Sequence, residues 1–216
     1  MMKPGSRLLA AIAVGFVGAT AMPTQVAVAD ELNVEITPFA AYRFGGTFDV
    51  EESSASYEID DSEALGLIFN LRQTGNTQWE VFYSRQQSTA RLRDSVATSP
   101  TVETNIQVLQ FGGTYQGSGD SVRPYLAMTL GGTHIKTTAN GSQSDTFWSG
   151  SVGVGVHVSP SSRLGFRLEA RAYGTLMNSN TDLFCRTGPD INVCAIRIDG
   201  SIMGQVEAFA GVVFRF

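Results

Sequence analysis

Histidine, serine and glutamate residues offer the only spacing in this chain that suggests covalent catalysis. The two histidines, His134 and His157, are the residues that could act as a general base near neutral pH. His157 precedes Ser159 by two positions, and Glu169 could complete a triad. His134 is expected near the rim of a strand, where a lone histidine is more often interfacial than catalytic.

Acidic pairs and two cysteines are the other groups with chemical potential. Glu51-Glu52 and Asp60-Asp61 fall in a polar stretch, which favours a solvated acidic loop over an acid/base pair. Cys185 and Cys194 lie close together in CRTGPDINVC, and no histidine or further cysteine accompanies them as a zinc site would need. We therefore expect a local disulfide if the chain is exported, and no metal or cofactor.

The first residues indicate export. Lys3 and Arg7 precede an apolar run from Leu8 to Val17, and Ala27-Val28-Ala29 is typical of a signal-peptidase site. We expect residues 1–29 to be a cleaved signal peptide and residues 30–216 to be the mature domain. Losing Lys3 and Arg7 changes the formal charge from −5 to −7, since 13 basic and 20 acidic residues remain. That acidic balance argues against a nucleic-acid partner.

Period-two alternation recurs along the mature chain and predicts an all-β fold. Between 163 and 173, Leu164, Phe166 and Leu168 alternate with charged positions that include Arg167, Glu169 and Arg171. Successive charges on one face do not suit a dry core, yet the other face is too apolar for water. A barrel with lipid outside and polar side chains inside satisfies both faces.

The connections also alternate in length. Residues 45–62, 86–104, 137–147 and 175–196 are long and polar, whereas short links fall at 74–76, 116–121 and 159–162. Outer-membrane barrels have short periplasmic turns and long external loops. We therefore predict a single eight-stranded antiparallel up-and-down transmembrane β-barrel with four external loops.

The last strand is the most specific feature of the sequence. Apolar or small residues occupy the even positions from Ile198 to Phe216, and the chain ends in GVVFRF. This pattern, with ITPFAAYRFGG, VRPYLAMTLGG and RLGFRLEARAYG, resembles the small outer-membrane β-barrel family of OmpA-, OmpX- and OmpW-type proteins. The resemblance implies a place in the outer membrane of a Gram-negative bacterium and an insertion signal at Phe214 and Phe216 that the insertion machinery reads.

Charged residues on the polar faces should meet inside so small a barrel, and buried charges must pair. We expect a lumen charge network, and the dominance of arginine over lysine suits it, because a guanidinium can hold two carboxylates. Its predicted members are Glu35, Arg43, Arg72, Glu80, Arg167, Glu169, Arg171 and Glu207.

These features favour a non-enzymatic barrel. The His157-Val158-Ser159 spacing resembles that of lipid A deacylases, but Pro160 stands where their motif has asparagine, and His157 is expected at the periplasmic end. We predict a monomer among outer-membrane lipids, with a closed interior and loops for structural or surface-interaction roles and a possible external ligand. The alternative is a narrow channel for small solutes or hydrophobic compounds, because small residues such as Gly66, Gly153 and Gly155 also face inward.

Overall fold

The computed structural model describes residues 34–49, 56–73, 75–92, 102–138, 143–177, 185–187, 192–194 and 202–216. Within these ranges the regular elements are strands. They are β1 (Val34–Gly45), β2 (Thr47–Asp49), β3 (Ser56–Ile59), β4 (Ser62–Arg72), β5 (Thr77–Leu92), β6 (Val102–Gln116), β7 (Val122–Thr137), β8 (Gln143–Val158), β9 (Leu164–Leu176), β10 (Cys185–Thr187), β11 (Asn192–Cys194) and β12 (Ile202–Arg215). In this described part, no helix is long and apolar enough to cross a membrane. The expected signal peptide lies outside it and stays a prediction.

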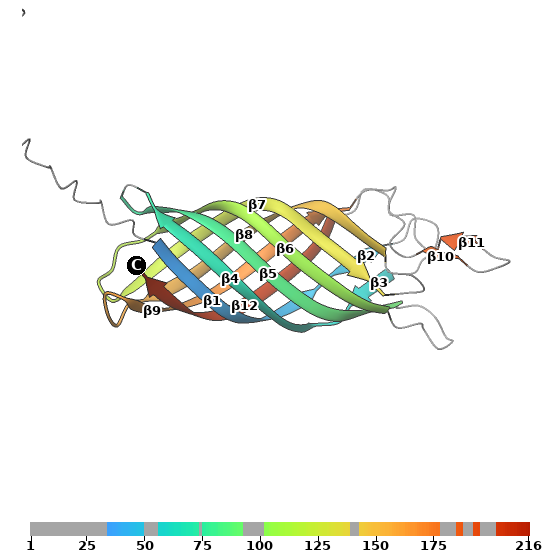
Figure 1. Cartoon of the computed structure of the whole chain (residues 1–216), viewed down its shortest axis with the longest axis horizontal. Coiled ribbons are helices and arrows are strands. Elements are labelled where there is room, and N and C mark those ends of the chain that lie inside the picture. Colours follow the sequence, from blue (N-terminus) through green and yellow to red (C-terminus); the bar gives the residue numbers. More distant parts are fainter. Residues whose placement is uncertain are drawn as a thin grey trace, which may run out of the picture. The chain divides into compact units, whose positions relative to one another are not determined.

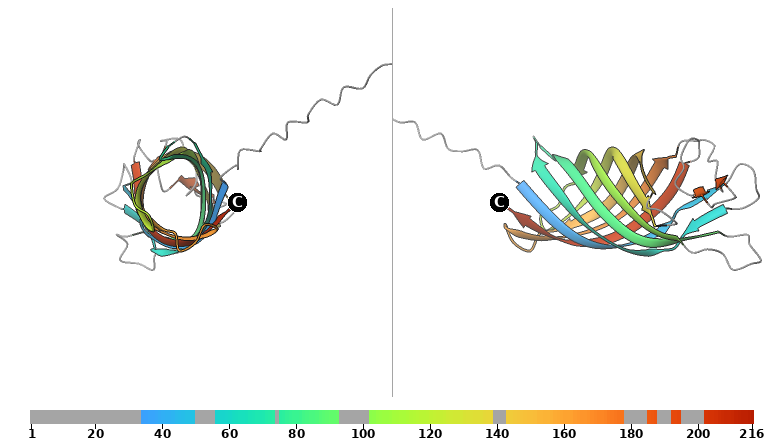
Figure 2. Two further views of the ribbon diagram at one scale, coloured as in Figure 1. Left: turned by 90° about the vertical axis from the view of Figure 1, so that its left-hand side faces the viewer. Right: turned by 45° about the vertical axis from the view of Figure 1, so that its right-hand side comes forward.

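Eight long strands close into one antiparallel barrel. They follow one another around the wall in the order β1, β4, β5, β6, β7, β8, β9 and β12, and β12 pairs with β1 to complete the ring. The strands cross the long axis obliquely in Figure 1 and enclose a single ring in the end-on view of Figure 2. The predicted eight-stranded up-and-down barrel is confirmed. The short strands β2 and β3 continue the wall beside β5, and β10 pairs with β11.

The register of the strands fixes the tilt and width of the barrel. A circuit through hydrogen-bonded partners that starts at Glu35 passes Glu80 and Thr129 and returns to β1 at Gly45, ten residues further on. With a rise of about 3.3 Å per residue and about 4.8 Å between strands, this offset tilts the strands by about 41°. An eight-stranded barrel of this tilt is narrow enough for side chains to fill it.

Alternation along each strand separates two very different surfaces. Large apolar side chains lie on the outer wall, where Leu65, Leu130 and Trp148 are 67%, 74% and 76% exposed. Polar side chains lie inside, where Arg43 and Glu80 are fully buried. This distribution is the reverse of that in a water-soluble protein and matches a wall that faces lipid.

The two ends of the barrel differ in their connections. Short links join β4 to β5, β6 to β7 and β8 to β9 at one end, where the Phe216 amide also donates to the Val34 carbonyl at 2.9 Å. The connections from β5 to β6 and from β9 to β12 are at the other end and are longer. The connection from β7 to β8, which was predicted to be long at 137–147, is also at that end but is as short as the links at the first end. By the rule for outer-membrane barrels, the first end, with its three short links, faces the periplasm. Phe214 and Phe216 are therefore exposed on the wall near the periplasmic rim.

Several strands extend further than the sequence pattern predicts. β5 continues to Leu92 and β6 begins at Val102, although residues 86–104 are polar and were expected to form a loop. β8 likewise begins at Gln143. Ladder hydrogen bonds do not require apolar side chains, so pairing can continue beyond the lipid band, where hydropathy no longer marks a strand.

The inward glycine Gly66 provides a test of how tightly the wall and interior are packed. A Cβ at this position would collide with the Phe39 ring and the Tyr83 carbonyl oxygen, so we expect Gly66→Ala to destabilise the barrel by about 1–3 kcal/mol. The matched control is Gly204→Ala, since Gly204 is exposed on the wall and a Cβ there meets open space. Urea unfolding in detergent measures both, and equal stabilities of the two variants would contradict this packing.

Candidate functional site: the charged interior

Two carboxylates and two guanidinium groups form the centre of the barrel interior. Glu80 accepts hydrogen bonds from Arg167 Nη2 at 2.8 Å and Arg171 Nη2 at 2.6 Å. Glu169 accepts from Arg167 Nη2 at 2.8 Å and Arg171 Nε at 2.5 Å. Each arginine therefore joins both glutamates, and at least 95% of each of these four residues is buried. We call these four residues the central quartet.

The quartet spans the full width of the barrel. Arg167, Glu169 and Arg171 occupy successive inward positions of β9, because side chains two residues apart share a face of a strand. Glu80 comes from β5, which lies four strands away from β9 in either direction around the ring. The ion pairs from Glu80 thus join opposite sides of the wall.

Neutral groups complete the hydrogen bonds of the quartet. Tyr125 donates its hydroxyl proton to Glu169 at 2.5 Å and accepts from Arg167 Nε at 2.7 Å. Asn70 Oδ1 accepts from Arg167 Nη1 at 3.1 Å. The Arg171 guanidinium also lies 4.0 Å from the centre of the Phe82 ring, within range for a cation–π interaction.

A second ion pair lies on the extracellular side of the quartet. Arg43 on β1 donates to Glu207 Oε2 on β12 from Nε at 2.9 Å and Nη2 at 2.6 Å. Tyr173 donates to the other oxygen of Glu207 at 2.8 Å, and Ser84 on β5 accepts from Arg43 at 2.7 Å. Both charged residues are fully buried. Within the described residues, Arg43 Nη1 has no hydrogen-bond partner.

Arg215 organises a third group of polar side chains near the periplasmic end. Its Nε donates to Glu35 at 2.7 Å, and its Nη2 lies 2.8 Å from both His157 Nε2 and Ser159 Oγ. His157 and Ser159 are therefore bound to the same guanidinium, whereas Glu169 belongs to the central quartet. The arrangement does not form the candidate triad, because the nitrogen that would serve as base already faces an arginine N–H.

Seven of the eight residues of the expected network are buried and take part in these three groups. They are Glu35, Arg43, Glu80, Arg167, Glu169, Arg171 and Glu207. Arg72 is instead exposed, because it is the last residue of β4 and reaches the tight link beyond the packed interior. Arg215, which the predicted network does not include, is the charged partner of Glu35.

Aromatic side chains inside the barrel were missed by the sequence analysis. The rings of Phe39, Phe82 and Phe209 form one cluster, with centroids 4.4 to 6.5 Å apart. All three occupy positions that the alternation assigns to the inner face, so the odd or even position along each strand is enough to predict them. Phe82 lies against the Arg171 guanidinium and beside Tyr173, the hydrogen-bond partner of Glu207, so the cluster links the central quartet to the Arg43–Glu207 pair.

The small inward residues make room for these larger groups. A Cβ at Gly153 would collide with the Glu169 carboxylate, and one at Gly155 would collide with the Tyr125 hydroxyl. Gly131 faces the backbone of Leu109 and Gln110 in the same way. At these three positions the space left by glycine is therefore occupied by neighbouring atoms.

The remaining candidate residues lie away from the interior. His134 Nδ1 contacts Thr146 Oγ1 at 2.9 Å on the exposed wall, and Asp61 accepts from the Gly45 amide at 3.0 Å. Cys185 and Cys194 are opposite each other in the β10–β11 register, but their side chains are outside the described set, so the disulfide stays a prediction. Among described residues, no cluster of three His, Cys, Asp or Glu could hold a metal.

Removing one member of the central quartet should leave buried charges without partners and lower the free energy of unfolding. Glu80→Ala leaves Arg167 and Arg171 with only Glu169, so we expect a loss of about 3–5 kcal/mol in the free energy of unfolding. Glu63→Ala removes an exposed carboxylate from β4 and should cost under about 0.5 kcal/mol. Urea titration followed by tryptophan fluorescence compares the two, and a Glu80→Ala loss as small as the control's would refute the pairing.

Comparisons with known proteins agree with this architecture. The neisserial surface protein A crystal structure aligns at 13% identity and a TM-score of 0.59, covering 85% of this chain and 97% of that one. The N-terminal barrel of Pseudomonas aeruginosa OprF also aligns, at 15% identity and a TM-score of 0.47, covering 86% of this chain and 98% of that one. Yersinia pestis Ail aligns at 15% identity and a TM-score of 0.44, covering 86% of this chain and 99% of that one. No curated protein sequence matches. Residues 9–192 match the outer membrane protein β-barrel domain, and the chain belongs to this family of the Gram-negative outer membrane.

Proposed function

We propose that this protein is a closed outer-membrane barrel that carries its activity on its extracellular loops, in a structural or surface-interaction role. The observation that carries the proposal is the central quartet, whose ion pairs join β5 to β9 across the whole width of the lumen. A barrel crossed by such pairs acts as a support for the segments it displays outside.

The energetics of the quartet support a closed interior. An ion that passed through the lumen would have to break ion pairs that are shielded from water. Each charged side chain released from its pair would then be buried without a counter-charge. The Arg43–Glu207 pair lies further along the same path. The Phe39, Phe82 and Phe209 rings pack together beside the quartet, where Phe82 contacts the Arg171 guanidinium.

A narrow conduit for hydrophobic compounds is the second candidate, and one observation favours it. The interior near the extracellular end contains a group of apolar side chains, Ile106, Ile135, Phe147 and Met203, all buried there among threonines and glutamines. Such a lining would accept a nonpolar molecule from outside. That molecule would still meet the Arg43–Glu207 pair next, which favours the closed barrel.

We also propose that the barrel has no catalytic role. His157 and Ser159 are engaged by Arg215, and the acidic groups of the interior are bound to arginines. The His157–Ser159 pair therefore does not supply a free base beside a nucleophile, as acyl transfer would need. We further propose that the protein is a monomer and that Phe214 and Phe216 form the signal for its insertion.

Ion flux through reconstituted protein tests the closed interior. Wild-type barrels in planar bilayers should give no discrete current steps. The double variant Glu80→Ala/Arg171→Ala removes opposite ends of a cross-lumen pair and should give measurable steps, because it deletes side-chain volume without leaving either member of the pair unpaired. Regular steps in the wild type, with the folded state verified by a heat-dependent shift on a gel, would defeat the proposal.

The mass of the purified protein tests two other features. We expect a mature chain that begins at Asp30, since residues 1–29 are proposed to be removed on export. We also expect a mass about 2 Da higher after reduction, because Cys185 and Cys194 should be bonded in the oxidising periplasm. A Cys185→Ser/Cys194→Ser variant serves as control and should show no change on reduction. An intact N-terminus or two free thiols in the wild type would contradict these expectations.

A further inference from the structure

The outer wall of β5, β6 and β7 changes abruptly from apolar to polar. On β5 the outward positions read Trp79, Val81 and Tyr83, and the next two are Arg85 and Gln87. The same change occurs on the neighbouring strands, where the residues registered beside Arg85 are Gln107 on β6 and, beyond it, His134 on β7. Polar groups therefore cover a continuous area on the side that faces lipid.

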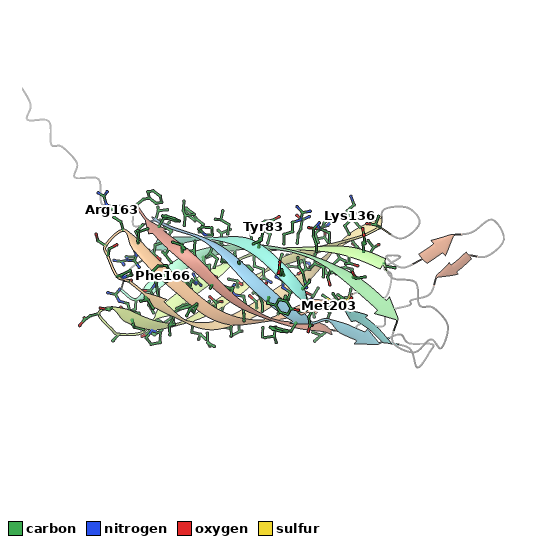
Figure 3. All side chains as sticks on the ribbon, turned by 90° about the horizontal axis from the view of Figure 1, so that it is seen from below. Tyr83, Lys136, Arg163, Phe166 and Met203 are labelled. Carbon is green, nitrogen blue, oxygen red and sulfur yellow. The ribbon has the colours of Figure 1, made fainter. Side chains whose placement is uncertain are left out.

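This area lies at the height of the extracellular head groups. From the register and the tilt of about 41°, the Arg85 Cα is about 24 Å above that of Phe216 along the barrel axis. The apolar band of such barrels is about 25 Å tall, so Arg85 stands at its extracellular edge. In Figure 3, Tyr83 lies on the wall, and Lys136 and Arg163 lie towards opposite ends of the barrel.

The positive charges of the area have carboxylates nearby but form no close ion pair with them in the described part of the chain. Glu103 lines the same hollow as Lys136, and Asp61 and Glu63 line a neighbouring one with Arg85. Arg85 Nε and Nη2 each lie 3.0 Å from the side-chain oxygen of Asn105 in the amide orientation that satisfies both groups. An amide positions the guanidinium without cancelling its charge. Among the described residues, no ion pair involves Arg85 or Lys136. This contrasts with the interior, where each buried arginine meets a carboxylate.

The wall is hollowed between these two cations. A hollow of about 550 Å³ is lined by Arg85, Lys136 and polar side chains that include Gln87, Asn105 and Gln107, with Glu103 towards its extracellular end. Tyr83 donates its hydroxyl proton to Gln107 at 3.2 Å, which fixes that amide in the lining of the hollow. The register separates the Cα atoms of Arg85 and Lys136 by about 12 Å.

We propose that this hollow binds the phosphorylated sugar head group of a glycolipid in the outer leaflet. Guanidinium and ammonium groups bind phosphate oxygens through charge-assisted hydrogen bonds, and side-chain amides can bind sugar hydroxyls. A single phosphodiester would occupy one cation, whereas a phosphorylated sugar can span the distance between Arg85 and Lys136. Its acyl chains would lie on Tyr83, Leu109 and the apolar wall below.

Native mass spectrometry of the detergent-purified full-length protein tests this site. The probes are diphosphorylated lipid A, the same glycolipid without its phosphates, and phosphatidylglycerol. The wild type should retain diphosphorylated lipid A at least about tenfold better than the other two, because charge-assisted hydrogen bonds to phosphate are stronger than those to hydroxyl groups. Equal retention of the phosphate-free glycolipid, or preference for phosphatidylglycerol, would overturn the proposal.

Substitutions assign the binding to the hollow. Arg85→Gln/Lys136→Gln should lower lipid A retention by about tenfold, since both charges contact phosphate. Arg163→Gln removes an exposed charge at the periplasmic rim and should leave retention unchanged. A heat-dependent gel shift verifies that each variant is folded. Undiminished retention in the double variant would assign the lipid to another surface, and the result is independent of whether the interior conducts ions.

Discussion

The requirement that every backbone polar group be satisfied within lipid governs this structure. A sheet meets it only by closing, because an open edge would leave amide and carbonyl groups unpaired in hydrocarbon. Closure with eight strands and an offset of ten residues produces a narrow lumen with no room for bulk water around each side chain. Any charged residue on the inner face must therefore find its partner inside the barrel.

This constraint explains why the interior groups adopt their observed form. Arg167 and Arg171 each contact two carboxylates, which a planar guanidinium with several donors can do and an ammonium group does less well. Glycines stand where the large polar groups need space, as Gly153 does beside Glu169. The inner wall thus combines small and large residues so that the charges are paired and the gaps are filled.

The sequence predicts the parts of the structure that depend on alternation. Strand number, wall orientation and the burial of residues such as Glu80 and Arg43 follow from period two, because lipid and lumen impose opposite polarity on adjacent positions. Alternation cannot show where a strand leaves the packed interior, so Arg72 was assigned inward although it is exposed. It also cannot identify which charges pair across the lumen, since that depends on the ring order of β5 and β9.

The outer wall must be apolar where it meets acyl chains, and the height to which its apolar surface extends differs around the ring. On β8, β9 and β12 exposed apolar residues continue to Trp148, Leu176 and Ile202, about 4–11 Å further out along the axis than Arg85. On β5 and β6 the apolar surface ends at Tyr83 and Leu109. At the height of Arg85, the β5–β6 side of the wall is polar and must meet head groups, whereas the opposite side is apolar and meets acyl chains. The same alternation that pairs charges inside therefore leaves Arg85 facing outward, where it forms no ion pair within the described residues and can meet a component of the membrane.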